Sequence, residues 1–162
     1  MKLAGEDTVA APPAAVWAAL IDPKVLRPLI PGCESLTGSP EAGYDIVAAR
    51  RVGGAELRLT GRVDMEAVRP PDGFDLRAHG SGGAAGGARG RARIRLIPEG
   101  AGTRLRWDLD AVVEGALGRF PEFVLRIAAG RVAEGFVRRF KAAVEGKAPP
   151  PPRRGLLGRL AG

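Results

Sequence analysis

The stretch TRLRWDLDAVV (Thr103–Val113), followed after a short gap by FPEFVLRIAAGRVAEGFVRRFKAAV (Phe120–Val144), decides the fold. In the first segment apolar and polar residues alternate, which is typical of a strand with one buried and one solvated face. In the second segment the apolar residues recur every three or four positions, which predicts an amphipathic helix of about 25 residues. Its predicted buried stripe consists of Phe120, Phe123, Val124, Ile127, Val132, Phe136, Phe140 and Val144.

The rest of the chain supplies the partners that this helix needs. The two-residue alternation recurs upstream, in residues 55–67, 73–79 and 88–97. The chain opens with a predicted strand, Lys2–Ala11, and two short helical segments follow it, Pro13–Ile21 and Val25–Ile30. We therefore predict an α+β fold, in which a curved antiparallel sheet of about seven strands wraps around one long C-terminal helix, with two short helices after strand 1.

The charge of the chain is unevenly distributed. Of 25 basic and 18 acidic residues, 15 of each lie in residues 1–118, so that part has no net charge. The remaining 10 basic and 3 acidic residues give residues 119–162 the whole net charge of +7. This asymmetry predicts an acidic partner for the C-terminal region. Acids in the N-terminal MKLAGEDTV, where a signal peptide would be apolar, favour a cytoplasmic protein.

The C-terminal end predicts a division into a domain and an appendage. Residues 1–146 form the predicted domain, residues 147–152 a proline-rich linker and residues 153–162 a short basic amphipathic tail. Four prolines in an extended polyproline conformation span about 12 Å. We expect the tail to contact an anionic membrane surface reversibly, because its leucines can insert while its arginines meet lipid headgroups. The predicted membrane-binding residues are Arg153, Arg154, Leu156, Leu157, Arg159 and Leu160.

Groups that could carry catalysis or bind a metal are scarce. The chain has one histidine, His79, and one cysteine, Cys33, so neither a histidine-based triad nor a zinc cluster can be assembled. His79 falls on the polar side of its predicted strand, and Cys33 is interpreted as a small buried residue. The glycine-rich stretch Gly80–Gly90 lies between two predicted strands, which favours a hairpin or bulge over a phosphate-binding loop. We predict no catalytic residue and no metal site.

Nucleic-acid binding is also disfavoured. Arginines at positions 89, 91, 93 and 95 line the polar side of one predicted strand. The aromatic residues, however, lie almost entirely in the apolar stripes, so no platform remains on which bases could stack. Acids on the same sheet surface offset the charge of the arginines. A solvated sheet face is the interpretation we adopt for these arginines.

The apolar interior leaves two interpretations open. A sheet this curved under one helix can enclose a cavity, or its side chains can fill the core completely. In the first case the lining offers few hydrogen-bonding groups, so the ligand would be lipid-like. The predicted lining residues are Trp17, Leu20, Leu57, Leu59, Phe74, Leu76, Ile94, Trp107, Phe120, Phe123 and Ile127.

Three segments resemble a known family. They are KLAGEDTVAAPPAAVWAALIDPKVL (Lys2–Leu26), IPGCESL (Ile30–Leu36) and GSGGAAGGARGRARI (Gly80–Ile94). Together with the order of predicted elements, they resemble the G-subunit family of carbon monoxide dehydrogenase, whose members have the helix-grip fold of the START and polyketide-cyclase superfamily. The resemblance covers roughly residues 1–145. It implies an accessory protein of a molybdenum hydroxylase such as carbon monoxide dehydrogenase, recruitment of that enzyme to the cytoplasmic membrane, and a lipoquinone ligand, menaquinone or ubiquinone.

The residues and the resemblance together predict a non-enzymatic carrier. It would bind a hydrophobic small molecule, lie at the inner face of the cytoplasmic membrane and link a molybdenum hydroxylase to that membrane, with no nucleic acid as partner. Two alternatives remain open: a recruitment or assembly adaptor with a filled core, and a ligand-transforming enzyme of the cyclase type.

Overall fold

A computed structural model describes residues 1–52 and 54–146 of the chain, so the predicted linker and membrane-binding tail lie outside the described residues. The elements, in chain order, are β1 (Lys2–Val9), α1 (Pro13–Leu20), α2 (Pro23–Leu26), η1 (Arg27–Leu29), β2 (Cys33–Ser39), β3 (Gly43–Val52), β4 (Ala55–Arg69), β5 (Gly73–Ser81), η2 (Gly83–Ala85), β6 (Gly87–Glu99), β7 (Gly102–Glu114), η3 (Gly115–Arg119) and α3 (Glu122–Glu145).

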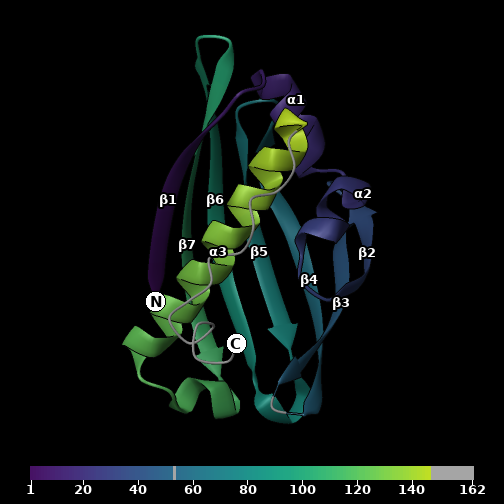
Figure 1. Cartoon of the computed structure of the whole chain (residues 1–162), viewed down its shortest axis with the longest axis vertical. Coiled ribbons are helices and arrows are strands. Elements are labelled where there is room, and N and C mark those ends of the chain that lie inside the picture. Colours follow the sequence, from purple (N-terminus) through teal and green to yellow (C-terminus); the bar gives the residue numbers. More distant parts are fainter. Residues whose placement is uncertain (53, 147–162) are drawn as a thin grey trace, which may run out of the picture.

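The strands form a single antiparallel sheet in the order β1-β7-β6-β5-β4-β3-β2. The sheet curves, and α3 crosses its concave face diagonally, from the foot of β1 to the end where α1 lies (Figure 1). The predicted fold is therefore confirmed: a curved antiparallel sheet, a long C-terminal helix and two short helices after the first strand.

Local sequence explains where the helices begin and end. Pro13 occupies the first turn of α1, where its missing N–H leaves no hydrogen bond unmade. The Asp22 side chain caps α2 by accepting a hydrogen bond of 2.9 Å from the backbone N–H of Lys24. After α3, Gly146 adopts the left-handed conformation, with φ of 70°, which terminates the helix.

The hydrophobic core occupies one end of the molecule, the upper end in Figure 1. There the last turns of α3 pack against α1 and the adjoining ends of the strands. Val9, Val16 and Phe140 are fully buried in this cluster. Its other buried members are Ala11, Trp17, Leu29, Phe74, Leu96 and Leu105.

Polar contacts fasten the same end of α3. The Arg139 guanidinium Nε donates a hydrogen bond of 2.8 Å to the carbonyl of Leu29 in η1. The Glu145 carboxylate accepts one of 2.7 Å from the backbone N–H of Ala10, directly after β1. The last turns of α3 are therefore held by both apolar packing and hydrogen bonds.

The predicted buried stripe of α3 is correct in its second half and wrong in its first. Phe136, Phe140 and Val144 pack into the core as expected. The stripe residues of the first half, Phe123, Val124, Ile127 and Val132, are instead exposed. A helix turns by about 100° per residue, so Phe123 and Ile127 lie about 100° and 140° away from Phe140 around the helix axis. The positions in line with Phe140 are occupied by Leu125, Ala129 and Ala133, which are half-buried.

Candidate functional site

The concave face of the sheet is the candidate ligand site. Trp107 pairs with Ile94 of β6, and Ile94 pairs with Phe74 of β5. Residues directly opposite one another point to the same face of a sheet. Because Phe74 contacts Trp17 of α1, this row faces the interior. A second row on the same face consists of Leu3, Leu109, Ala92, Leu76 and Met65.

Two of the predicted lining residues belong to the packed end. The rings of Trp17 and Phe74 meet edge to face, with centroids 5.4 Å apart and an interplanar angle of 78°. Both side chains are buried in the core cluster, and Leu20, Leu76 and Ile94 pack against that cluster while remaining partly accessible. Trp17 and Phe74 thus form the closed end of the concave face.

Trp107 lies further along the concave face and depends on a glycine. A Cβ atom at Gly5 of the neighbouring strand would lie 2.5 Å from Cζ2 of the Trp107 ring, closer than any real contact. The indole therefore lies against the backbone of β1 at Gly5, where only glycine leaves room for it. Trp107 is half-buried, so part of the ring is accessible on the concave face.

Leu57 and Leu59 line the opposite end, on β4. Both are half-buried. The glycine-rich stretch forms the hairpin that the sequence predicts, with η2 between β5 and β6. A Cβ atom at Gly82 of this hairpin would lie 3.0 Å from Cδ2 of Leu59, so the glycine backbone packs directly against a predicted lining residue.

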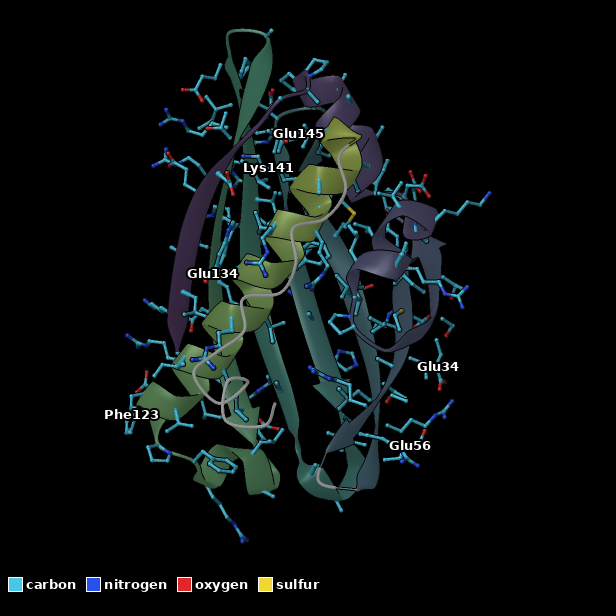
Figure 2. All side chains as sticks on the ribbon, in the orientation of Figure 1. Glu34, Glu56, Phe123, Glu134, Lys141 and Glu145 are labelled. Carbon is cyan, nitrogen blue, oxygen red and sulfur yellow. The ribbon has the colours of Figure 1, made fainter. Side chains whose placement is uncertain are left out.

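The three remaining lining residues were predicted to be enclosed, and this is wrong. Phe120 is 54% exposed, Phe123 is 66% exposed and Ile127 is 54% exposed. Phe123 lies at the lower end of α3, on the side turned away from β4 and β5 (Figure 2). The cause is the rotation of the helix described above. Whether these side chains touch a ligand stays a prediction.

The middle of the concave face is lined by small residues that the prediction missed. Ala111, Gly90, Ala78 and Val63 form a row across β7, β6, β5 and β4. They are partly accessible rather than buried, and within residues 1–52 and 54–146 no α-helix covers the lower part of β4 and β5 (Figure 1). The alternation in residues 103–113 already placed Ala111 on the apolar side, but its small size gave no sign that this part of the face stays partly accessible.

The buried Tyr44 of β3 uses its polar group for a structural contact. The Tyr44 hydroxyl donates a hydrogen bond of 2.8 Å to the carbonyl of Ile21, which ties β3 to the end of α1. Burial, followed by the nearby Glu41 and Asp22 carboxylates, raises the pKa of Tyr44 above its ordinary value of 10.0. Within residues 1–52 and 54–146 there is no cluster of His, Cys, Asp and Glu side chains that could hold a metal ion.

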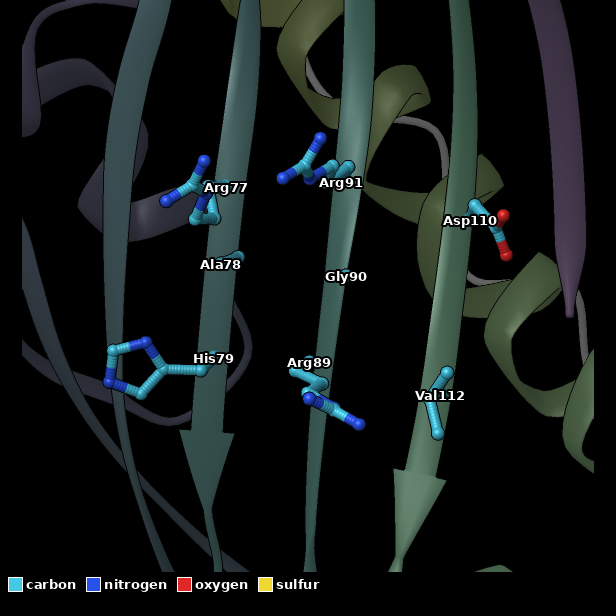
Figure 3. Close-up of a pocket in the computed structure, with 8 residues that line it drawn as sticks. All are labelled: Arg77, Ala78, His79, Arg89, Gly90, Arg91, Asp110 and Val112. Atoms are coloured by element: carbon cyan, nitrogen blue, oxygen red, sulfur yellow. The ribbon is translucent and has the colours of Figure 1, made fainter.

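The convex face carries the charges. A depression of ≈ 500 Å³ lies over β5, β6 and β7, and its wall includes His79, Arg91 and Val112 (Figure 3). Arg77 and Arg89 of the same wall pair with acids of neighbouring strands, Arg77 with Glu66 at 2.9 Å and Arg89 with Glu114 at 3.1 Å. His79 is exposed on this face, as predicted, and therefore lies across the sheet from the apolar rows. The pairing of charges agrees with a solvated sheet face.

Comparisons with known proteins place these features in a family. The family model for the G-subunit of carbon monoxide dehydrogenase (CoxG) matches residues 5–145. A search of curated protein sequences finds no match. In the part of the chain that the structure describes, no helix is both long and apolar enough to cross a membrane.

Solved structures share the fold at low sequence identity. A conserved protein from Geobacillus kaustophilus has a TM-score of 0.81 at 22% identity, with 90% of this chain and 96% of that chain covered. An uncharacterised protein from Rhizobium leguminosarum has a TM-score of 0.73 at 15% identity, with 91% and 95% covered. A START superfamily protein from Mycobacterium smegmatis has a TM-score of 0.68 at 14% identity, with 90% and 97% covered.

Proposed function

The chain belongs to the CoxG family of carbon monoxide dehydrogenase, and on that basis we propose that it is a non-enzymatic accessory protein of a molybdenum hydroxylase of the carbon monoxide dehydrogenase type. Its concave face would carry a lipoquinone, menaquinone or ubiquinone, at the inner face of the cytoplasmic membrane. Its C-terminal tail would hold the protein, and with it the enzyme, near the lipid.

The observation that supports a lipophilic ligand is the uneven filling of the concave face. Among the described residues, the core cluster closes one end of the concave face, at Trp17 and Phe74. Beyond it, Trp107, Leu57 and Leu59 remain partly accessible, with a row of small residues between them. Apolar, partly open concave surfaces are where proteins take up hydrophobic small molecules. A quinone ring with an isoprenoid chain has the matching chemistry, because it offers a large apolar surface and few polar atoms.

The distribution of charge supports a carrier over an enzyme. General acid–base catalysis needs a titratable side chain within hydrogen-bond reach of the substrate. The only histidine, His79, lies on the convex face, and the ion pairs of β5 and β6 lie there as well. A ligand on the concave face would therefore meet mainly hydrocarbon, which holds a molecule without transforming it.

Tryptophan fluorescence tests the proposal directly. The chain has two tryptophans, Trp17 in the closed end and Trp107 on the accessible part of the concave face. Quinones quench indole fluorescence at short range, so titration with a short-chain ubiquinone analogue should give saturable quenching. In Trp107→Phe the remaining signal comes from Trp17, and we expect most of the saturable component to disappear. Quenching that rises linearly, without saturation, in both proteins would contradict a bound quinone.

Filling the concave face separates a carrier from an adaptor with a filled core. Ala111→Phe adds a ring to the row of small residues. If that space is open, the variant should keep the wild-type stability and lose saturable quenching. If it is already filled, overpacking should lower the free energy of unfolding by about 1–3 kcal/mol. Val112→Phe is the matched control, since it adds the same ring to the next residue, which is 49% exposed on the convex face.

A further inference from the structure

The first half of α3 presents an apolar surface away from the sheet. Phe120, just before the helix, and Phe123, Val124 and Ile127 within it are all exposed, Val124 least at 37%. We call these four residues the α3 apolar face. Phe123 and Ile127 are four positions apart and therefore lie next to each other on the helix surface. A contiguous exposed patch of this kind on a folded domain marks an interaction site.

No described part of the chain covers this surface. The tertiary polar contacts that fasten α3 come from its last turns, through Arg139, Lys141 and Glu145. In the first two turns, the ion pair of 3.0 Å between Arg126 and Glu122 stays within the helix. The patch thus belongs to the end of α3 that the core does not hold, and it lies at the same end of the domain as the part of the concave face that no described α-helix covers (Figure 1).

Basic residues outnumber acidic residues around the α3 apolar face. Residues 119–134 contain three arginines, Arg119, Arg126 and Arg131, and two acids, Glu122 and Glu134, so the net charge is +1. Arg119 and Arg131 are exposed and have no acidic partner among the described residues. Residues 1–118, by contrast, carry no net charge. The patch is therefore flanked by cations that are available to an external anion.

We propose that the α3 apolar face, with Arg119, Arg126 and Arg131, docks on the surface of an anionic lipid bilayer. The phenylalanine and aliphatic side chains would insert at the level of the headgroups, and the arginines would meet lipid phosphates. This contact is made by the folded domain itself and is separate from that of the tail. If the protein carries a lipoquinone, as proposed above, docking would hold the end of the domain with the partly accessible concave face near the lipid.

Charge repulsion disfavours a second copy of the chain, and the chain segment 147–162, as the partner of the α3 apolar face. In a symmetric pair of two copies, each patch would face itself, so the arginines of one copy would meet those of the other. The chain segment 147–162 carries four basic residues and no acid, so it would be repelled as well. A stable protein interface needs about 800 Å² from each partner, much more than four side chains supply. A bilayer requires no shape-matched partner surface and provides both hydrocarbon and negative charge.

Vesicle sedimentation of the full chain tests the docking. The vesicles are phosphatidylcholine alone or phosphatidylcholine with phosphatidylglycerol. The test variant carries Phe123→Ser and Ile127→Ser together. The matched control carries Val112→Ser and Ile97→Ser, which also remove two exposed apolar side chains, 49% and 37% exposed, but from the convex face. All proteins keep the tail, so the tail contributes equally to each.

We expect the test variant to bind phosphatidylglycerol vesicles about tenfold more weakly than the wild type, with an unchanged melting temperature, and the control to bind like the wild type. Equal binding by all three proteins, or equal losses in both variants, would overturn the docking. So would a wild-type dimer in gel filtration that the test variant alone dissociates, because a second copy would then cover the patch. Quinone quenching of the wild type is measured separately, without vesicles. Loss of saturable quenching would contradict the lipoquinone proposal without affecting the docking, and failure of the vesicle test would contradict the docking without affecting the lipoquinone proposal.

Discussion

The two halves of α3 should respond very differently to the same substitution, and this can be measured with Phe140→Ala and Phe123→Ala. Phe140 is fully buried, and its ring stacks on Phe136 with centroids 6.2 Å apart. Removing a buried phenylalanine side chain costs about 3–5 kcal/mol, through lost transfer energy and the cavity left behind. Phe123 keeps only about a third of its surface from water, so it loses about 0.5–1 kcal/mol by the same area argument. The higher helix propensity of alanine offsets part of this loss in the free energy of unfolding.

Urea denaturation, followed by circular dichroism, gives both values from the midpoint and the slope. A domain of this size has a total stability of about 5–15 kcal/mol, so Phe140→Ala can leave little folded protein. Phe140→Leu then serves as a milder version that keeps most of the buried volume. A loss above about 2 kcal/mol for Phe123→Ala would show that the first half of α3 is packed as tightly as a core, and would refute the assignment of the α3 apolar face.

Three further outcomes are expected. Gly86 and Gly83 both have positive φ, but a Cβ atom at Gly86 would clash with the backbone carbonyl of Glu114, whereas a Cβ atom at Gly83 would meet open space. Gly86→Ala should therefore lower the melting temperature of the domain more than Gly83→Ala does. Burial raises the pKa of Tyr44 in the folded state, so its contribution to stability is complete below about pH 10 and is lost as the pH rises through the folded value. Absorbance titration of tyrosinate, to which this single tyrosine alone contributes, should therefore give a midpoint above 10.0, and Tyr44→Phe should weaken the alkaline loss of stability. A chain ending at Lys147 should keep the melting temperature of the full chain but bind anionic vesicles more weakly. About 0.5 M salt should weaken the binding of the full chain, because salt screens exposed charges. Equal binding by the two chains, or binding that salt does not change, would contradict a membrane-contacting tail.

The strands were predictable because alternation fixes which face of a strand is buried. In β7, Leu105, Trp107 and Leu109 point to the concave side as their spacing indicates. The same pattern cannot say how far along the sheet the core extends. That depends on where α1 and the last turns of α3 meet the sheet, which is a tertiary contact between segments more than 100 positions apart, as in the bond between Arg139 and Leu29. The alternation of residues therefore could not predict which end of the concave face is closed by the core.

The rotation of α3 was missed for a different reason. Phe123 and Ile127 satisfy the four-residue spacing of a buried stripe on their own, so the helix carries two apolar stripes of which only one can face the sheet. Spacing alone does not distinguish the line of large side chains in the first half from the line that contains Ala129 and Ala133. Strict extrapolation from Phe140, at about 100° per residue, selects the line with the two alanines.

Small residues occur both on the sheet-facing side of α3 and on the concave face of the sheet, and this bears on function more than any single contact. Ala129 lies on the sheet-facing side of the helix, while Ala78, Gly90 and Ala111 lie on the concave side of the strands. A core selected for stability alone would fill such a space, since each buried methylene group contributes about 0.8 kcal/mol. Here Leu125, Ala129 and Ala133 take the sheet-facing positions of α3, and Phe123 and Ile127 are exposed instead. Only one of the large apolar side chains in the first two turns therefore adds to the interior, while the others lie on the surface where the proposed membrane contact lies.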